Sequence, residues 1–161
     1  MKKANKIIGE SKVEEPNVIY GTTIASGNIP FSYKNMISDD QHLIQSANKG
    51  IAATAITEFS KFSGKTKEEI ANWIYITPKT VRSYEATAKK LPTLQSELLL
   101  KLYMLYDKGI TVFGNAQAFN EWLALPSFGL YHQTPESLLT TITGMSMVQD
   151  ELTRISYGDF A

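Results

Sequence analysis

Basic and hydroxyl side chains gather in one short stretch of the chain, residues 77–90. If a helix begins at Pro78, then Lys79, Arg82 and Ser83 share its outward face, because residues three and four apart lie on the same side of a helix. Lysine and arginine can donate hydrogen bonds to guanine edges, and hydroxyls can donate to bases or phosphates. The stretch therefore supplies a candidate DNA-binding set: Thr77, Lys79, Thr80, Arg82, Ser83, Lys89 and Lys90.

Residues that enzymes use are sparse and scattered. The chain has no cysteine, and its two histidines, His42 and His132, lie far apart with no metal-ligand spacing. Gly109 and Gly114 frame a short apolar segment, but no lysine follows as it would in a phosphate-binding loop. We expect a surface or loop position for both histidines. The sequence predicts no enzyme: no catalytic residue, no metal and no cofactor.

Two short helices must position the candidate DNA-binding set. Thr66 and Glu69 have the spacing of a capping box at the start of the first helix. Thr77 followed by Pro78 is typical of the start of a second. The apolar spacing is that of a helix-turn-helix motif, in which a small residue lies where the helices touch. The positions expected to face inward are Ile70, Ala71, Ile74, Ile76, Val81 and Tyr84.

One position departs from the motif. Tyr75 occupies the turn where helix-turn-helix proteins usually have glycine, because the backbone there often has positive φ. Either the turn has another shape or the motif is partly degenerate. Two alternatives to DNA binding follow: the charges after Pro78 could form an ordinary solvated helix face, or the chain could have lost an ancestral DNA-binding role.

A long apolar helix is expected over residues 94–113. One face of this helix carries Leu94, Leu98, Leu102 and Leu105. A neighbouring apolar stripe consists of Leu99, Tyr103, Tyr106, Ile110 and Phe113. Because the two together are wider than one face, the helix must be covered on two sides. Residues 64–92 before it carry six basic and three acidic side chains, whereas residues 115–161 after it carry one basic and five acidic. Phosphate would attract the first segment and repel the second. This helix is expected to join two differently charged units.

The fold class predicted is all-α. Residues 1–35 lack a sustained period and are expected to form a flexible arm. Residues 36–92 should form a helical bundle containing the helix-turn-helix, and residues 93–161 the long helix with a small helical unit. Three helices are expected in that unit. The first covers residues 115–125, the second starts at Thr134 and is broken by Gly144, and the third covers residues 145–157. No apolar run is long enough to span a bilayer, so a cytoplasmic protein is expected.

The C-terminal half resembles the toxin-binding domain of the Xre/MbcA/ParS antitoxins. The resemblance extends over roughly residues 50–161 and includes the helix-turn-helix in the expected place. The order and spacing of some fifteen positions carry it, among them Trp122-Leu123, Pro126, Leu130, Thr134-Pro135, Leu138-Leu139, Gly144, Glu151-Leu152, Arg154-Ile155, Tyr157-Gly158 and Phe160-Ala161. The family usually has two glycines where this chain has Tyr131 and His132, so the loop before Thr134 is expected to differ.

The resemblance implies an antitoxin of a type II toxin-antitoxin pair. Its partner would be a RES-domain toxin that consumes NAD, and its helix-turn-helix domain would bind operator DNA to repress the shared operon. Residues 93–161 would then be the toxin-binding domain, and its tail would approach the toxin's NAD pocket. By position, the neutralising segment would be Arg154, Tyr157, Gly158, Asp159, Phe160 and Ala161.

A different class of function competes with the antitoxin. The chain could be a stand-alone helix-turn-helix regulator whose C-terminal unit dimerises or binds a ligand. A toxin gene beside this one would favour the antitoxin, and an isolated gene would favour the regulator. In either case a homodimer is expected if the DNA half-sites are one helical turn apart.

Overall fold

A computed structural model describes residues 29–158 of the chain, and this part consists of helices joined by turns and loops. None of the described helices has the length and apolar character needed to cross a membrane. Two predictions lie outside the described residues: the arm over residues 1–28, and the roles of Asp159, Phe160 and Ala161. The elements in chain order are α1 (Phe31–Lys34), η1 (Asn35–Ile37), α2 (Asp40–Lys49), α3 (Thr54–Ser63), α4 (Lys67–Trp73), α5 (Pro78–Ala86), α6 (Thr93–Phe113), α7 (Ala116–Leu123), η2 (Phe128–Leu130), α8 (Pro135–Leu138) and α9 (Ile142–Ser156).

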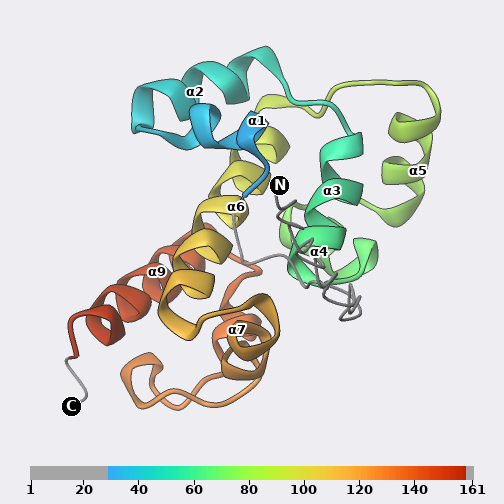
Figure 1. The fold of residues 1–161 in the computed structure, drawn as a ribbon. Helices are drawn as coiled ribbons and strands as arrows, with labels where there is room; N and C mark the ends of the chain where they lie inside the picture. The colour runs from blue at the N-terminus through green and yellow to red at the C-terminus, as the bar shows by residue number, and fades with distance from the viewer. Residues whose placement is uncertain (1–28, 159–161) are drawn as a thin grey trace, which may run out of the picture.

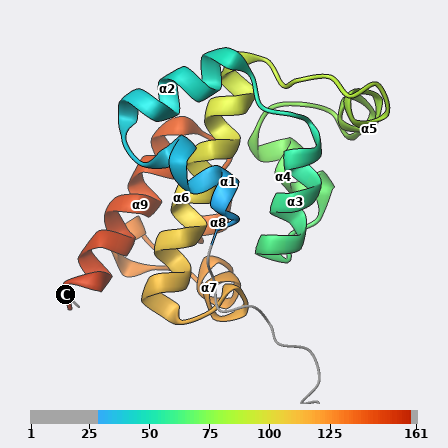
Figure 2. The same ribbon diagram turned by 45° about the horizontal axis from the view of Figure 1, so that its top comes forward.

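The helix α6 lies at the centre of the molecule, as its wide apolar face predicts. Figures 1 and 2 show α3, α4 and α5 on one side of α6 and α9 on the other. Its side chains Leu98, Leu99, Leu102 and Tyr103 are almost fully buried. Leu94 is an exception, with 45% of its surface exposed, so the prediction that it belongs to the buried face is wrong. In the first turn of α6, Ser96 is fully buried, whereas Thr93 and Leu94 are exposed to solvent.

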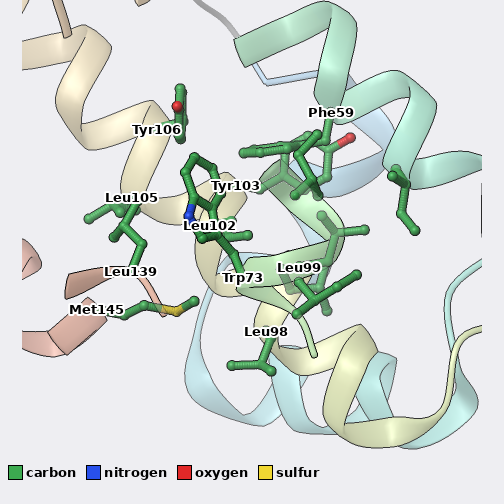
Figure 3. Close-up of a cluster of buried hydrophobic side chains, with 14 of the residues drawn as sticks. Phe59, Trp73, Leu98, Leu99, Leu102, Tyr103, Leu105, Tyr106, Leu139 and Met145 are labelled. Atoms are coloured by element: carbon green, nitrogen blue, oxygen red, sulfur yellow. The ribbon is translucent and has the colours of Figure 1, made fainter. Parts of the chain in front are cut away.

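One hydrophobic cluster spans the described chain from Ile29 to Leu152. The ring of Phe59 on α3 meets the rings of Tyr103 and Tyr106 edge to face, at centroid distances of 4.8 and 5.1 Å. Figure 3 shows Leu139 and Met145 approaching α6 from a different side. Because α6 contributes to both contacts, the helices before it and after it share one core.

The chain is already ordered before residue 36. Ile29 and Tyr33 are buried, the Tyr33 ring stacks on Tyr103 at 4.3 Å, and its hydroxyl donates to Glu58 at 2.7 Å. The prediction of a flexible arm is therefore wrong for residues 29–35. The sequence shows little period there because α1 is a single turn whose stability comes from α3 and α6.

The last helix begins earlier than expected. Thr141 caps α9 by accepting a hydrogen bond from the Gly144 amide at 2.9 Å, so Gly144 lies inside the first turn and the prediction that it breaks a helix is wrong. A Cβ on Gly144 would lie 2.0 Å from the Leu138 carbonyl oxygen. The glycine is needed for the close approach of α8 and α9.

Candidate functional site

The helices α4 and α5 form a pair joined by a short turn. The capping box at Thr66 and Glu69 is present, and Thr77 caps α5 by accepting from the Thr80 amide at 3.1 Å. Ala71 and Val81 are buried between the helices, as expected, while Ile76 and Tyr84 are partly buried. The local signals in the sequence therefore predicted both helix starts and the inward faces.

The turn before α5 has the backbone that glycine usually provides. Tyr75 has φ of 57°, in the left-handed region, which costs a residue with a Cβ about 1 kcal/mol. Its side chain is half exposed, and its hydroxyl donates to the Thr140 carbonyl at 2.6 Å. The turn keeps a left-handed backbone despite Tyr75, and the tyrosine contacts the C-terminal helices in return.

The outward face of α5 is exposed and basic. Lys79, Arg82 and Ser83 are all exposed to solvent. The acidic residue of α5, Glu85, is turned toward α4, where it accepts from Lys67 at 2.8 Å and from the Thr57 hydroxyl. Its carboxylate therefore does not offset the positive charge of the outward face.

The remaining members of the predicted DNA-binding set are also accessible, but the fold uses several of their polar atoms. The hydroxyls of Thr77 and Thr80 share a 2.9 Å hydrogen bond at the helix cap. The Lys90 ammonium donates to the Lys49 carbonyl at 3.0 Å, and the Lys89 ammonium lies 5.8 Å from the centre of the Tyr84 ring. Both lysines are exposed to solvent just after the end of α5, as phosphate contacts would require.

A buried carboxylate anchors the loop between α7 and α8. Glu151 on α9 is only 5% exposed, and it accepts from the Ser127 hydroxyl at 2.9 Å while Arg154 lies 3.3 Å from its other oxygen. A Cβ on Gly129 would come within 2.2 Å of the Glu151 carboxylate. We did not assign Glu151 this role from the sequence. The available signal was its spacing of three from the buried Val148, which places a charge beside the apolar stripe.

The loop before Thr134 has two residues with a Cβ in backbone conformations that glycine favours. Tyr131 and His132 have φ of 55° and 63°, which are left-handed conformations that glycine adopts easily. The amide of His132 donates to the Ser127 carbonyl at 2.9 Å, and the amide of Ser127 donates to the Gln133 carbonyl at 3.1 Å. The hydrogen bonds of the loop hold both residues in this backbone.

The described part of the predicted neutralising segment lies at the end of α9. Arg154 is partly exposed beside Glu151, Tyr157 is 84% exposed, and Gly158 has φ of 75°. Figures 1 and 2 show this end of α9 far from α5, on the opposite side of α6. The structure therefore groups the two predicted residue sets on two separate surfaces.

The two histidines occupy surface positions. His42 lies 2.7 Å from Asp39 at the start of α2, and the His132 ring meets the Phe128 ring at a centroid distance of 5.4 Å. Among residues 29–158 there is no group of three or more His, Asp or Glu that could hold a metal ion.

The comparisons with known proteins agree on one class of protein. Residues 108–158 match the family model of the antitoxin Xre/MbcA/ParS C-terminal toxin-binding domain. An antitoxin Xre of Yersinia enterocolitica is 25% identical over 120 residues, which cover 74% of this chain and 81% of that protein. An antitoxin Xre of Photorhabdus laumondii is 26% identical over 125 residues, covering 75% and 82%.

These matches define the chain as an antitoxin of a toxin-antitoxin system. A toxin-binding domain of the Xre/MbcA/ParS type occupies its residues 108–158, and the similarity to the two antitoxins named Xre extends over 74% and 75% of the chain. The matched segment begins in the second half of α6 and includes Arg154, Tyr157 and Gly158, whereas α5 precedes it. The loop anchored by Glu151 lies wholly inside the matched segment.

Proposed function

We propose that this antitoxin neutralises a RES-domain toxin by covering its NAD-consuming active site. The segment that reaches the active site is Arg154, Tyr157, Gly158, Asp159, Phe160 and Ala161. The single observation that carries this proposal is the exposed end of α9: Tyr157 is 84% exposed directly after a helix whose inner face, at Val148 and Leu152, is fully buried. The end of α9 therefore presents Tyr157 to a partner. The protein acts by binding, with no catalytic residue of its own.

The charge of the C-terminal region supports the same partner. Residues 115–161 carry one basic and five acidic side chains. Glu151 is buried beside Arg154 and Glu136 pairs with Lys65, but Glu121 and Asp150 are exposed. A pocket that binds an anionic dinucleotide is expected to present positive charge, which attracts these exposed carboxylates. The RES class itself rests on the resemblance of the matched positions to the family.

We further propose that α5 binds operator DNA and thereby regulates the operon. Arg82 and Lys79 contact guanine edges, Ser83 donates to a base or phosphate, and Thr77, Thr80, Lys89 and Lys90 contact the backbone. The exposed basic face of α5 and the inward orientation of Glu85 support this assignment. Two copies of the chain place their α5 helices in successive major grooves, so a homodimer is the binding unit.

Co-expression with the neighbouring gene tests the neutralising role. A chain that lacks Tyr157 to Ala161 should fold and bind operator DNA like the full chain, yet fail to protect cells or to stop NAD loss by the purified toxin. A matched control is Phe31→Ala, which removes an exposed aromatic side chain far along the chain from α9 and should protect fully. Protection by the truncated chain would refute the proposal.

A further inference from the structure

The loop between α7 and α8 exposes large apolar side chains on a rigid frame. Leu125, Phe128 and Tyr131 are 61%, 71% and 79% exposed. The frame consists of the Ser127–Gln133 backbone pairing and the hydrogen bond from Ser127 to the buried Glu151. Adjacent exposed aromatic residues on an ordered loop are typical of protein-binding sites.

Folding does not explain the presence of Tyr131. Its backbone is left-handed, where any side chain destabilises the fold relative to glycine, and its ring is mostly in water. Tyr75, which shares this backbone, gains a hydrogen bond to Thr140 in compensation. The Tyr131 side chain therefore lowers the stability of the free protein, and contact with a binding partner could offset this loss.

The position of the loop selects the partner. The loop lies within the segment that matches a toxin-binding domain. Through Ser127 and Glu151 it is joined to α9 only three residues before Arg154, where the neutralising segment begins. A protein that covers the end of α9 therefore meets a surface continuous with this loop.

We propose that Phe128 and Tyr131 form a second anchor for the toxin, separate from the neutralising tail. The inference rests on the proposed function and deepens it: the tail blocks the active site, and the aromatic pair supplies much of the affinity. Phe128 is held in place by the edge-to-face contact with His132. Rigid aromatic side chains are frequent hot spots of protein interfaces, because they bury much area with little loss of conformational freedom.

Three variants test the anchor against a catalytically inactive toxin encoded by the neighbouring gene. Tyr131→Gly and Phe128→Ala should each weaken binding and raise the dissociation constant for the toxin on the order of 10- to 100-fold, as hot-spot truncations do. The free Tyr131→Gly protein should melt at the same or a higher temperature, since glycine relieves the left-handed backbone. Ala88→Gly is the matched control: Ala88 has φ of 50° outside the loop, so it should be stabilised without weaker toxin binding.

A chain that lacks Tyr157 to Ala161 separates the anchor from the tail. It should still bind the toxin, more weakly, without preventing NAD loss, and adding Tyr131→Gly should remove this residual binding.

If the full wild-type chain fails to bind the toxin, the proposed function itself is refuted. If wild type binds and the loop variants bind equally well, only the anchor is refuted. If the loop variants change the oligomeric state by light scattering without changing toxin affinity, the loop joins two copies of this chain, and the anchor is refuted.

Discussion

The hydroxyl of Tyr75 donates a 2.6 Å hydrogen bond to the backbone carbonyl of Thr140, which lies 65 positions later in the chain. Tyr75 belongs to the turn that precedes α5, and Thr140 lies between α8 and α9. A second polar contact joins the same regions, because the Lys65 ammonium lies 2.7 Å from the Glu136 carboxylate and is only 12% exposed. The proposed DNA-binding and toxin-binding units are therefore tied directly, as well as through α6.

Removing the Tyr75 hydroxyl should weaken this tie. Tyr75→Phe keeps the ring and the left-handed backbone, so the free energy of unfolding should fall by about 0.5–1.5 kcal/mol, near the lower end because the bond is exposed. Tyr75→Gly loses the same bond but relieves a backbone cost of about 1 kcal/mol, so it should be closer to wild type. Urea unfolding of the three proteins measures both differences. A Tyr75→Phe protein as stable as wild type would show that the bond contributes nothing.

Adding one methyl group at Gly129 should disturb the loop between α7 and α8. The new Cβ would lie 2.2 Å from a Glu151 carboxylate that Ser127 and Arg154 hold in place. Gly129→Ala should therefore lower the free energy of unfolding by about 1–3 kcal/mol, as overpacking does. In the Gly129→Ala, Glu151→Ala double variant the two losses should not add, because truncating Glu151 removes the clash. Additive losses, measured by thermal unfolding, would argue against this contact.

Arg82 should determine operator specificity. If Arg82 contacts a guanine, Arg82→Ala should lose about 1–3 kcal/mol of discrimination against the wrong base. Lys34→Ala is the matched control, since it removes one exposed positive charge on α1 and should leave the footprint on the gene's own promoter intact. Gel shifts and footprints at one fixed salt concentration compare the variants. An unchanged Arg82→Ala footprint would rule out the assigned contact.

Acid should destabilise the α4–α5 pair through Glu85. Burial alone would raise the pKa of this carboxyl, but hydrogen bonds from Lys67 and Thr57 and the Lys67 charge outweigh burial and hold the pKa below its usual 4.5. A lowered folded-state pKa gives stability that is present above the usual value and is lost as the pH falls below it. The melting temperature should therefore decline below about pH 4.5. Glu85→Gln should melt lower at neutral pH and decline less, and a wild-type decline retained in full would exclude Glu85 as a source.

Local chemistry made much of the helical framework predictable. Thr66 with Glu69, and Thr77 with Pro78, satisfy backbone groups only a few residues away, so their effect does not depend on the rest of the fold. The apolar width of α6 likewise predicted a central helix covered on two sides. Local signals failed where a neighbour in space decides the structure. The sequence around Gly144 is typical of a helix break, yet Gly144 lies in the first turn of α9, where α8 makes a close approach.

The sequence by itself determined the helix starts, the central apolar helix and the types of residue exposed on α5 and at the end of α9. Only the tertiary structure decided that Tyr75 reaches Thr140, that Glu151 holds the loop at Ser127, and that Tyr131 remains in water on a left-handed backbone. The physical reason is the distance along the chain over which each interaction acts. Caps and helical periods act within one or two turns, whereas these contacts join segments brought together only when the whole core around α6 packs.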